Sequence, residues 1–411
     1  MNASMSETVT PSAGQGRIDW ALRGMPVLKA IEKRLTESGT LVGLRVGVAL
    51  VLEPKTANLA LALNRAGADV SVYCVGRNTD GRVASALAEA GLQVFAEEGA
   101  GDERDLELAR DFLRTKPDIL LDDGASLIRL AHREFPELVA SMLGAAEETT
   151  SGVRPLRAMN DEGALHIPVI AVNDAKTKYL FDNVYGTGQS CVMAMLDITN
   201  LQLAGRNVVV VGYGWVGTGV AKHAAAMGAR VIVTELDPIK ALQALHDGYR
   251  VLSLADAAPQ AEVIFAATGI AGVVTAAHVA DLPSGAILCT AGGGAFELPM
   301  DYLDSTGTGR IVREAITEYT LPSGKTVQVI SEGDCLNCAD AEGNPIEVMD
   351  LSLSLQALAA EQIATEATSW APGVYPISVD AENAVAVIRL RHEGATLEPL
   401  TDELTAAMRS W

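Results

Sequence analysis

The sequence is poor in histidine, in cysteine and in positive charge, and each shortage narrows what the protein can do. Its 411 residues include six His, and 31 Lys and Arg stand against 52 Asp and Glu, so the formal net charge is −21 at pH 7. Such an acidic chain is not expected to bind nucleic acid, because phosphates would be repelled. No run approaches the roughly 18 apolar residues that a membrane span needs, so no membrane partner is expected.

The first 16 residues are small and polar, without the apolar core of a signal peptide. We therefore expect an irregular start and a cytoplasmic protein. The five cysteines are scattered along the chain, and free cytosolic thiols are the default interpretation. Cys335 and Cys338 form a CxxC motif, but no second pair or suitably spaced histidine accompanies it, so we expect no metal site.

What the chain does contain is a regular alternation of strands and helices. Its residues are 49% hydrophobic and 20% charged, typical of a globular protein of two or three domains. Apolar runs such as 46–52 and 169–172 predict buried strands, and helical spacing marks segments such as 20–36 and 348–365. This order predicts an α/β fold with two doubly wound parallel-sheet domains joined by a hinge, plus a short C-terminal tail.

The strongest motif follows a β-branched apolar run at residues 207–211. That run leads into a glycine-rich turn, a helical segment and a second apolar run that ends at Glu235. The pattern is that of a dinucleotide-binding βαβ unit, in which the helix N-terminus faces the phosphates. Gly212 allows the tight turn, Gly214 lets the backbone approach a pyrophosphate, and Gly217 lets helix and strand pack closely. A carboxylate at Glu235 accepts hydrogen bonds from a ribose 2′-OH and repels a 2′-phosphate, which favours NAD over NADP.

Three stretches together resemble the adenosylhomocysteinase family, whose members hydrolyse S-adenosylhomocysteine reversibly with the help of NAD. They are residues 147–153, 172–186 and 212–238, and residues 121–124 and 332–337 extend the similarity over almost the whole chain. The end at Ser410 and Trp411 resembles the shorter bacterial and archaeal branch. The resemblance implies a closed homotetramer and four segments: a substrate-binding domain over 1–184, a Rossmann NAD-binding domain over 185–345, a return helix over 346–375 and an oligomerisation tail over 376–411.

The resemblance also implies a reaction and a set of site residues. In the family, the ribose 3′-OH is oxidised to a ketone, the C4′ proton becomes acidic, the 5′ substituent is eliminated and water adds. Lys178 and Asp182 resemble the pair that handles the 3′-OH proton, Asp123 the residue near C4′, and Glu148 the residue that holds the 2′- and 3′-hydroxyls. The positions that resemble cofactor contacts are Thr149, Thr150, Ser151, Asn183, Gly212, Gly214, Trp215, Val216, Gly217, Glu235 and Asn337.

Departures from the family concern three histidines near the 5′ position. Val51 and Asn344 stand where two of them are expected, and the segment after Cys289 lacks the third. The family's STQD-like stretch is replaced at residues 77–82, and the Lys and Tyr of the family tail are absent. Glu53 shares a strand face with Val51, so it could take over proton transfer at C5′. It could equally contact the base or Lys55, and both alternatives stay open.

We therefore expect an NAD-dependent hydrolase or hydro-lyase of this family with diverged specificity. It would act on an adenosine-type nucleoside by transient 3′-oxidation, C4′–H abstraction and 4′,5′-elimination or addition of water, as in a nucleoside dehydratase. One alternative is an authentic adenosylhomocysteinase that converts S-adenosylhomocysteine to adenosine and homocysteine. A second alternative is a non-catalytic NAD-binding regulatory homologue.

Overall fold

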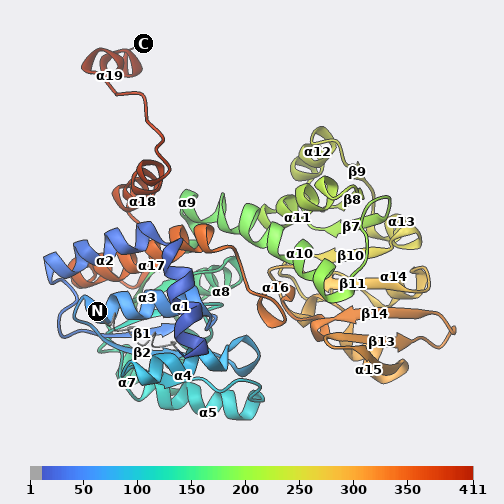
Figure 1. Cartoon of the computed structure of the whole chain (residues 1–411), viewed down its shortest axis with the longest axis horizontal. Coiled ribbons are helices and arrows are strands. Elements are labelled where there is room, and N and C mark those ends of the chain that lie inside the picture. The colour runs from blue at the N-terminus through green and yellow to red at the C-terminus, as the bar shows by residue number, and fades with distance from the viewer. Residues whose placement is uncertain (1–11, 411) are drawn as a thin grey trace, which may run out of the picture.

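The computed structural model describes residues 12–410, except for the side chain of Ala295, and divides the chain into two α/β units (Figure 1). The first unit contains a seven-stranded, all-parallel sheet in the order β15-β6-β5-β4-β1-β2-β3. Its strands are β1 (Arg45–Ala49), β2 (Asp69–Tyr73), β3 (Gln93–Phe95), β4 (Ile119–Asp122), β5 (Gly144–Glu147), β6 (Pro168–Ala171) and β15 (Gly373–Pro376).

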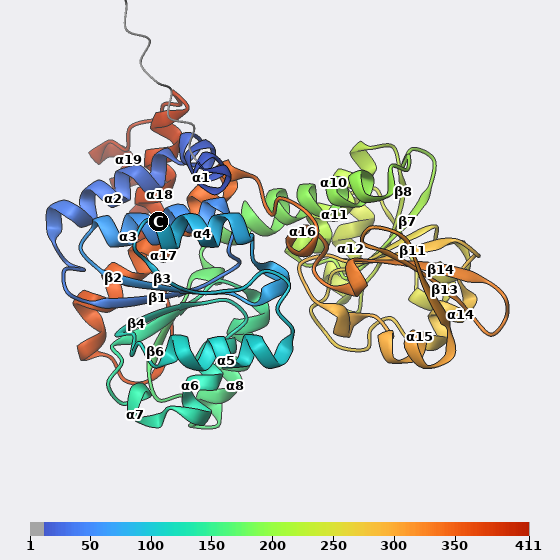
Figure 2. The ribbon, with the colours of Figure 1, turned by 60° about the horizontal axis from the view of Figure 1, so that its bottom comes forward.

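Helices cover both faces of this sheet, as Figure 2 shows. One face packs against α1 (Ala13–Arg23), α2 (Pro26–Ser38), α3 (Pro54–Arg65), α4 (Gly81–Glu89), α17 (Ile346–Glu366) and α18 (Val379–His392). The other face packs against α5 (Asp102–Leu113), α6 (Ser126–Glu134), α7 (Pro136–Val139) and α8 (Thr150–Asp161). The near-continuous apolar character of the strands follows from this burial on two faces.

The second unit contains an eight-stranded sheet in the order β12-β13-β14-β11-β10-β7-β8-β9. Six strands are parallel and have the order of a dinucleotide-binding sheet, whereas β12 and β13 extend the edge as antiparallel strands. The strands are β7 (Asn207–Val211), β8 (Arg230–Thr234), β9 (Arg250–Val251), β10 (Val263–Ala266), β11 (Ala286–Thr290), β12 (Thr308–Arg313), β13 (Ile316–Thr320) and β14 (Thr326–Ile330). The helices of this unit are α10 (Gly188–Thr199), α11 (Trp215–Ala226), α12 (Pro238–His246), α13 (Leu254–Ala257), α14 (Ala276–Asp281), α15 (Met300–Thr306) and α16 (Leu336–Ala339).

Two connections join the units. The chain leaves the first unit through α9 (Lys176–Tyr179), the π-helical segment η3 (Asp182–Thr187) and α10, and it returns through α16 and residues 340–345 into α17. Beyond β15, α18 packs on α2 and α17 with Val385 fully buried. Helix α19 (Asp402–Arg409) buries no residue and stands away from the body in Figure 1.

The predicted α/β class with two parallel-sheet domains is confirmed, with local corrections. The single helix expected at 20–36 is broken, because Pro26 starts a new helix where its missing N–H costs nothing. The irregular start is wrong from Ala13 onward, since Ser12 caps α1 by accepting a hydrogen bond from the Gln15 N–H; residues 1–11 lie outside the described part. Strand β5, made mostly of Gly and Ala, carries no large apolar side chain and was not predicted. No helix within 12–410 is long and apolar enough to cross a membrane.

Candidate active site

The predicted site residues of the first unit lie at the carboxyl ends of its parallel strands. The strand order reverses between β1 and β4, and ligands of such sheets bind in the crevice outside this point. Asp123 follows β4, Glu148 follows β5, and Lys178 comes shortly after β6 on α9. Because parallel strands end at one edge, three separate sequence segments meet there.

A buried cluster of one lysine and two carboxylates forms at this edge. The Nζ atom of Lys178 lies 2.9 Å from Asp182 Oδ2 and 3.8 Å from Glu148 Oε1, and it donates a hydrogen bond of 3.3 Å to Asn183 Oδ1. Lys178 is only 2% exposed, and Glu148 and Asp182 are buried as well. The sequence-predicted Lys178, Asp182, Glu148 and Asn183 are therefore brought together.

Burial and charge act in opposite directions within the cluster. Burial disfavours the charged lysine, but the nearby Asp182 and Glu148 carboxylates outweigh it and raise the pKa of Lys178. Burial raises the pKa of Glu148 to about 7, although Lys178 lowers it. Burial also raises the pKa of Asp123, against the effect of a hydrogen bond from Thr149 and the charge of Lys178. The arrangement thus holds a cation beside Glu148, a carboxyl group that can exchange protons near neutral pH.

The Glu147 carboxylate holds the loops around Asp123 and Thr149. Glu147 accepts hydrogen bonds from the backbone N–H groups of Gly124 (2.8 Å), Ala125 (2.9 Å) and Thr149 (2.9 Å). A side chain at Gly152 would collide with this carboxylate, so a glycine is required there. Thr149, Thr150 and Ser151 consequently lie at the start of α8, beside the cluster.

The glycine motif of the second unit has the geometry that the sequence predicts. Gly212 adopts φ +95°, and a side chain at Gly217 would collide with the carbonyl oxygen of Gly212. Open space lies in front of Gly214, which caps the N-terminus of α11, where the first N–H groups have no intrahelical partner. Glu235 accepts hydrogen bonds from the backbone N–H groups of Tyr213 and Leu236, each of 2.7 Å, and so lies against the turn. These residues fit the pyrophosphate and ribose of a dinucleotide.

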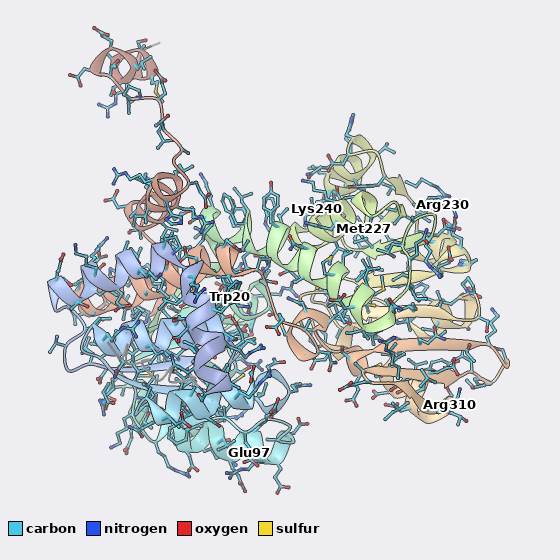
Figure 3. All side chains as sticks on the ribbon, viewed as in Figure 1. Trp20, Glu97, Met227, Arg230, Lys240 and Arg310 are labelled. Carbon is cyan, nitrogen blue, oxygen red and sulfur yellow. The ribbon has the colours of Figure 1, made fainter. Side chains whose placement is uncertain are left out.

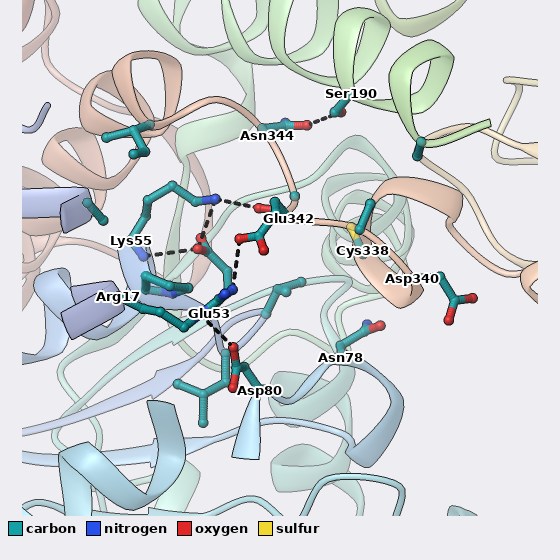
Figure 4. A pocket seen from close by; sticks show the side chains of 18 of the residues that line it. Arg17, Glu53, Lys55, Asn78, Asp80, Ser190, Cys338, Asp340, Glu342 and Asn344 are labelled. Carbon is teal, nitrogen blue, oxygen red and sulfur yellow. Dashed lines mark hydrogen bonds and ion pairs between the residues drawn. The ribbon is translucent and has the colours of Figure 1, made fainter. Parts of the chain in front are cut away.

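A cleft of about 1220 Å³ lies between the two units, and Ser190 and Asn344 are among the residues that line it (Figure 4). The cluster itself does not line this cleft; Asn344 links the two through its hydrogen bond to Asp182. Its wall in the first unit includes Glu53 and Lys55 at the start of α3, and the 64% exposed Trp20 of α1 (Figure 3). The cleft is large enough for a nucleoside with a 5′ substituent.

Glu53 is tied to Lys55 within this wall. Its Oε2 atom lies 2.9 Å from Lys55 Nζ and accepts a hydrogen bond of 3.0 Å from the Lys55 backbone N–H, which caps α3. Lys55 Nζ also donates to the carbonyl oxygen of Glu342 at 2.7 Å. Burial raises the pKa of Glu53, against the charge of Lys55. Of the two alternatives left open by the sequence, the contact with Lys55 is observed, and the role in proton transfer stays a prediction.

The sequence did not reveal the residues that hold Glu148 and Asp182. Ser352 and Gln356 of α17 both donate hydrogen bonds to the Glu148 carboxylate, the latter at 2.6 Å. Their signal was a polar stripe at helical spacing in an otherwise apolar, buried helix. Asn344, known from the sequence only as a departure, donates to Asp182. No comparable signal marked it, because Asp182 and Thr187, to which it donates, are more than 150 positions away in the chain.

Asn337 contacts two thiols, and the neighbouring Cys338 lines the cleft. Asn337 Oδ1 accepts hydrogen bonds from the thiols of Cys191 (3.3 Å) and Cys335 (3.1 Å), and Cys335 Sγ lies 3.4 Å from Cys338 Sγ. Among residues 12–410, no group of three or more His, Cys, Asp or Glu side chains is arranged to hold a metal ion.

Comparison with known proteins places these features in a context. The sequence model of S-adenosyl-L-homocysteine hydrolase matches residues 4–134, and that of its NAD-binding domain matches residues 183–343. An S-inosyl-L-homocysteine hydrolase of Methanopyrus kandleri is 45% identical over 97% of this chain and 95% of its own length. An adenosylhomocysteinase of Thermococcus kodakarensis is 42% identical over 98% of this chain and 96% of its own length. An S-inosyl-L-homocysteine hydrolase of Methanocaldococcus jannaschii is 42% identical over 97% of this chain and 96% of its own length.

Proposed function

Because the chain belongs to the S-adenosyl-L-homocysteine hydrolase family of NAD-dependent enzymes, we propose that it reversibly hydrolyses the thioether of an S-nucleosyl-L-homocysteine. The observation that carries this proposal is the buried cluster of Lys178, Asp182 and Glu148, which the hydrogen bond from Asn344 to Asp182 links to the interdomain cleft. A non-catalytic homologue would have no use for a desolvated lysine among carboxylates, which is costly to bury.

Each residue of the cluster has a distinct proposed task. Glu148, held by two donors from α17, binds the 2′- and 3′-hydroxyls and fixes the ribose. Lys178 and Asp182 hold and transfer the 3′-OH proton. NAD, which the glycine motif would hold, would supply reversible hydride transfer at C3′. Asp123 removes the C4′ proton, which a neighbouring ketone makes acidic. Glu235 and the start of α11 hold the dinucleotide.

The chemistry of the leaving group favours a thioether over the dehydration that the sequence put first. A thiolate leaves without full protonation, whereas hydroxide needs a strong acid beside it. The described residues of the cleft include no histidine, and Val51 and Asn344, which replace family histidines, carry no titratable proton. Cleavage of the thioether therefore depends less than dehydration on a general acid near C5′.

Dehydration of a 5′-hydroxyl nucleoside is a second candidate because of one observation. Glu53 lines the cleft, and burial raises its pKa, so a protonated carboxyl could assist departure of hydroxide. Its ion pair with Lys55 opposes this role, since the cation favours the ionised carboxylate.

The base is expected to meet the polar wall formed by Lys55 and Glu53. An ammonium group has three donors; the structure assigns partners for Lys55 Nζ in Glu53 and the Glu342 carbonyl. The third N–H of Lys55 Nζ can donate to a carbonyl oxygen at position 6 of a purine, whereas an amino group at that position is itself a donor. Among similar proteins, one is named for a 6-oxo purine substrate, S-inosyl-L-homocysteine, and another for a 6-amino purine substrate, adenosylhomocysteine. We therefore place hypoxanthine ahead of adenine.

The deciding experiment supplies purified protein with S-inosyl-homocysteine, S-adenosyl-homocysteine, and inosine or adenosine without a thioether. Release of a free thiol from either thioether, with transient absorbance of bound NADH, is the expected result. Alkene formation from the 5′-hydroxyl nucleosides without thiol release would instead establish the second candidate. In that case Glu53→Gln should lower turnover by about 100- to 10,000-fold, whereas thioether hydrolysis should tolerate this substitution far better.

The C-terminal segment is proposed to join subunits. Helix α19 buries no residue within its own chain and exposes Leu404 and Met408 by 47% and 79%, an apolar surface that a second copy would cover. Light scattering of the full chain should give a homotetramer, and removal of residues 393–411 should yield smaller species. A full chain that is monomeric would rule this out.

A further inference from the structure

The side chain of Asn344 uses its full hydrogen-bonding capacity. Its Nδ2 atom donates to Asp182 Oδ1 and, at 3.1 Å, to Thr187 Oγ1. Its Oδ1 atom accepts from Ser190 Oγ at 2.8 Å and from Asn337 Nδ2 at 2.9 Å. A carboxamide has two donors and two acceptor sites, so every bond that Asn344 can make is made within the protein (Figure 4 shows the bond with Ser190).

The orientation of the Asn344 amide is set by Asn337 and by the two thiols that contact Asn337. The thiols of Cys191 and Cys335 both donate to Asn337 Oδ1, so Asn337 must present its Nδ2 to Asn344. Asn344 consequently turns its Oδ1 toward Asn337 and its Nδ2 toward Asp182. A flipped amide at Asn344 would bring two oxygen atoms together and leave two buried donors facing each other, which is costly.

The two oxygens of Asp182 are thereby assigned to different partners. Oδ2 pairs with Lys178 Nζ at 2.9 Å, and Oδ1 receives the hydrogen bond from Asn344. Asp182 begins the π-helical segment η3, while Asn344 lies on the irregular connector that returns from the second unit to α17. Gly186 leaves the space for this approach, since a Cβ there would lie 3.0 Å from Asn344 Nδ2.

We propose that Asn344 is a positioning residue, which fixes the plane of the Asp182 carboxylate against the Lys178 ammonium once the interdomain connector is in place. The inference rests on the proposed role of Asp182 in handling the 3′-OH proton. A histidine at this place, as the family resemblance predicts, would add a second titrating group beside Asp182. Asn344 donates the same kind of hydrogen bond at every pH, so proton transfer at the 3′-OH is left to Asp182 and Lys178.

The test compares Asn344→Asp, Asn344→Ala and Asn344→His with Asn200→Asp. The last makes the same chemical change at the left-handed end of α10, outside this network. The rate at which inosine or adenosine reduces the bound NAD is measured against pH, together with NAD content per subunit. Asn344→Asp replaces a donor by a second carboxylate, so reduction at neutral pH should fall about 100-fold, and the acid limb of the profile should move upward by about one pH unit or more.

The other variants separate positioning from support of the fold. Asn344→Ala should slow reduction without moving the acid limb, and Asn344→His should recover part of the rate where its imidazole is neutral and an N–H can donate to Asp182. Asn200→Asp should match the wild type. Equal losses of rate and of NAD in all three Asn344 variants, with unshifted profiles, would mean a purely structural role and overturn the proposal.

A measurement without substrate keeps the inference distinct from the proposed function. Two buried carboxylates cannot both ionise at low cost, so the urea midpoint of Asn344→Asp should fall below that of Asn344→Ala as pH rises from about 5 to about 8. Midpoints that differ equally at both pH values would refute the contact with Asp182. If no thioether is cleaved by the wild type but nucleosides still reduce NAD and the Asp variant behaves as described, the proposed substrate fails and the role of Asn344 stands.

Discussion

Replacement of Lys178 by Met removes the cation that pairs with the buried carboxylates of Asp182 and Glu148. At an effective dielectric constant of about 20, its separations of 2.9 Å from Asp182 and 3.8 Å from Glu148 correspond to gross attractions of about 6 and about 4 kcal/mol. Much of this is offset by the cost of burying the ammonium. Loss of one partner from a buried pair is therefore expected to destabilise the fold by about 3–5 kcal/mol when the carboxylates stay ionised.

The penalty should depend on pH with a definite sign. Burial already raises the pKa of Glu148 from its usual 4.5 to about 7, and removal of Lys178 raises it further. A carboxyl group with a raised folded-state pKa favours the folded state below its unfolded pKa and loses this contribution as pH rises through the folded pKa. Relative to the wild type, Lys178→Met should therefore lose little folding stability at about pH 5, where protonation removes the unpaired charge. The loss of stability should be largest at about pH 8.

Urea denaturation at both pH values measures this difference, and Lys176→Met on the same helix is the matched control, because Lys176 is exposed. The control should resemble the wild type at both pH values. Lys178→Met should also fail to reduce bound NAD with nucleoside, with a loss of about 100-fold or more. Equal destabilisation of the variant at both pH values, or reduction of NAD at the wild-type rate, would contradict this role of Lys178.

Three further predictions concern single side chains. Asp123→Asn should still allow nucleoside to reduce bound NAD but should block exchange of the C4′ proton in D₂O; exchange at the wild-type rate would exclude Asp123 as the base. Glu235→Ala should weaken NAD binding by about 10- to 100-fold, the value of a charge-assisted hydrogen bond, and should reduce the preference for NAD over NADP. Titration of cofactor-depleted protein with each dinucleotide measures both effects. Lys55→Gln should reduce the preference for S-inosyl- over S-adenosyl-homocysteine by about 10-fold or more; an unchanged ratio of kcat/KM values would place the base elsewhere.

The sequence by itself determined the elements and the chemistry that they carry. The β-branched runs that lead into Gly212 and Glu235 specify a buried strand, a tight turn and a helix start through local sterics and hydrogen bonding, so the NAD site was predictable. The doubly wound class followed in the same way from alternation of strands and helices. Lys178 and Asp182 were identified because residues 172–186 resemble a stretch of the family; composition and spacing alone did not single them out.

Only the tertiary structure decided which groups surround them. Glu148 meets Ser352 and Gln356, and Asp182 meets Asn344, across more than 150 positions of sequence. These pairs form because parallel strands end at one edge and the return connector passes over it, and nothing in the local pattern encodes that encounter. Glu53 shows the same limit. The apolar run at 46–52 predicts a strand that places Glu53 on the face of Val51, whereas β1 ends at Ala49 and Glu53 caps α3. Its ion pair with Lys55, whose ammonium also donates to the carbonyl oxygen of Glu342, depends on that cap and on the connector. Charge and burial are properties of the assembled site, so they could be read only after the chain had folded.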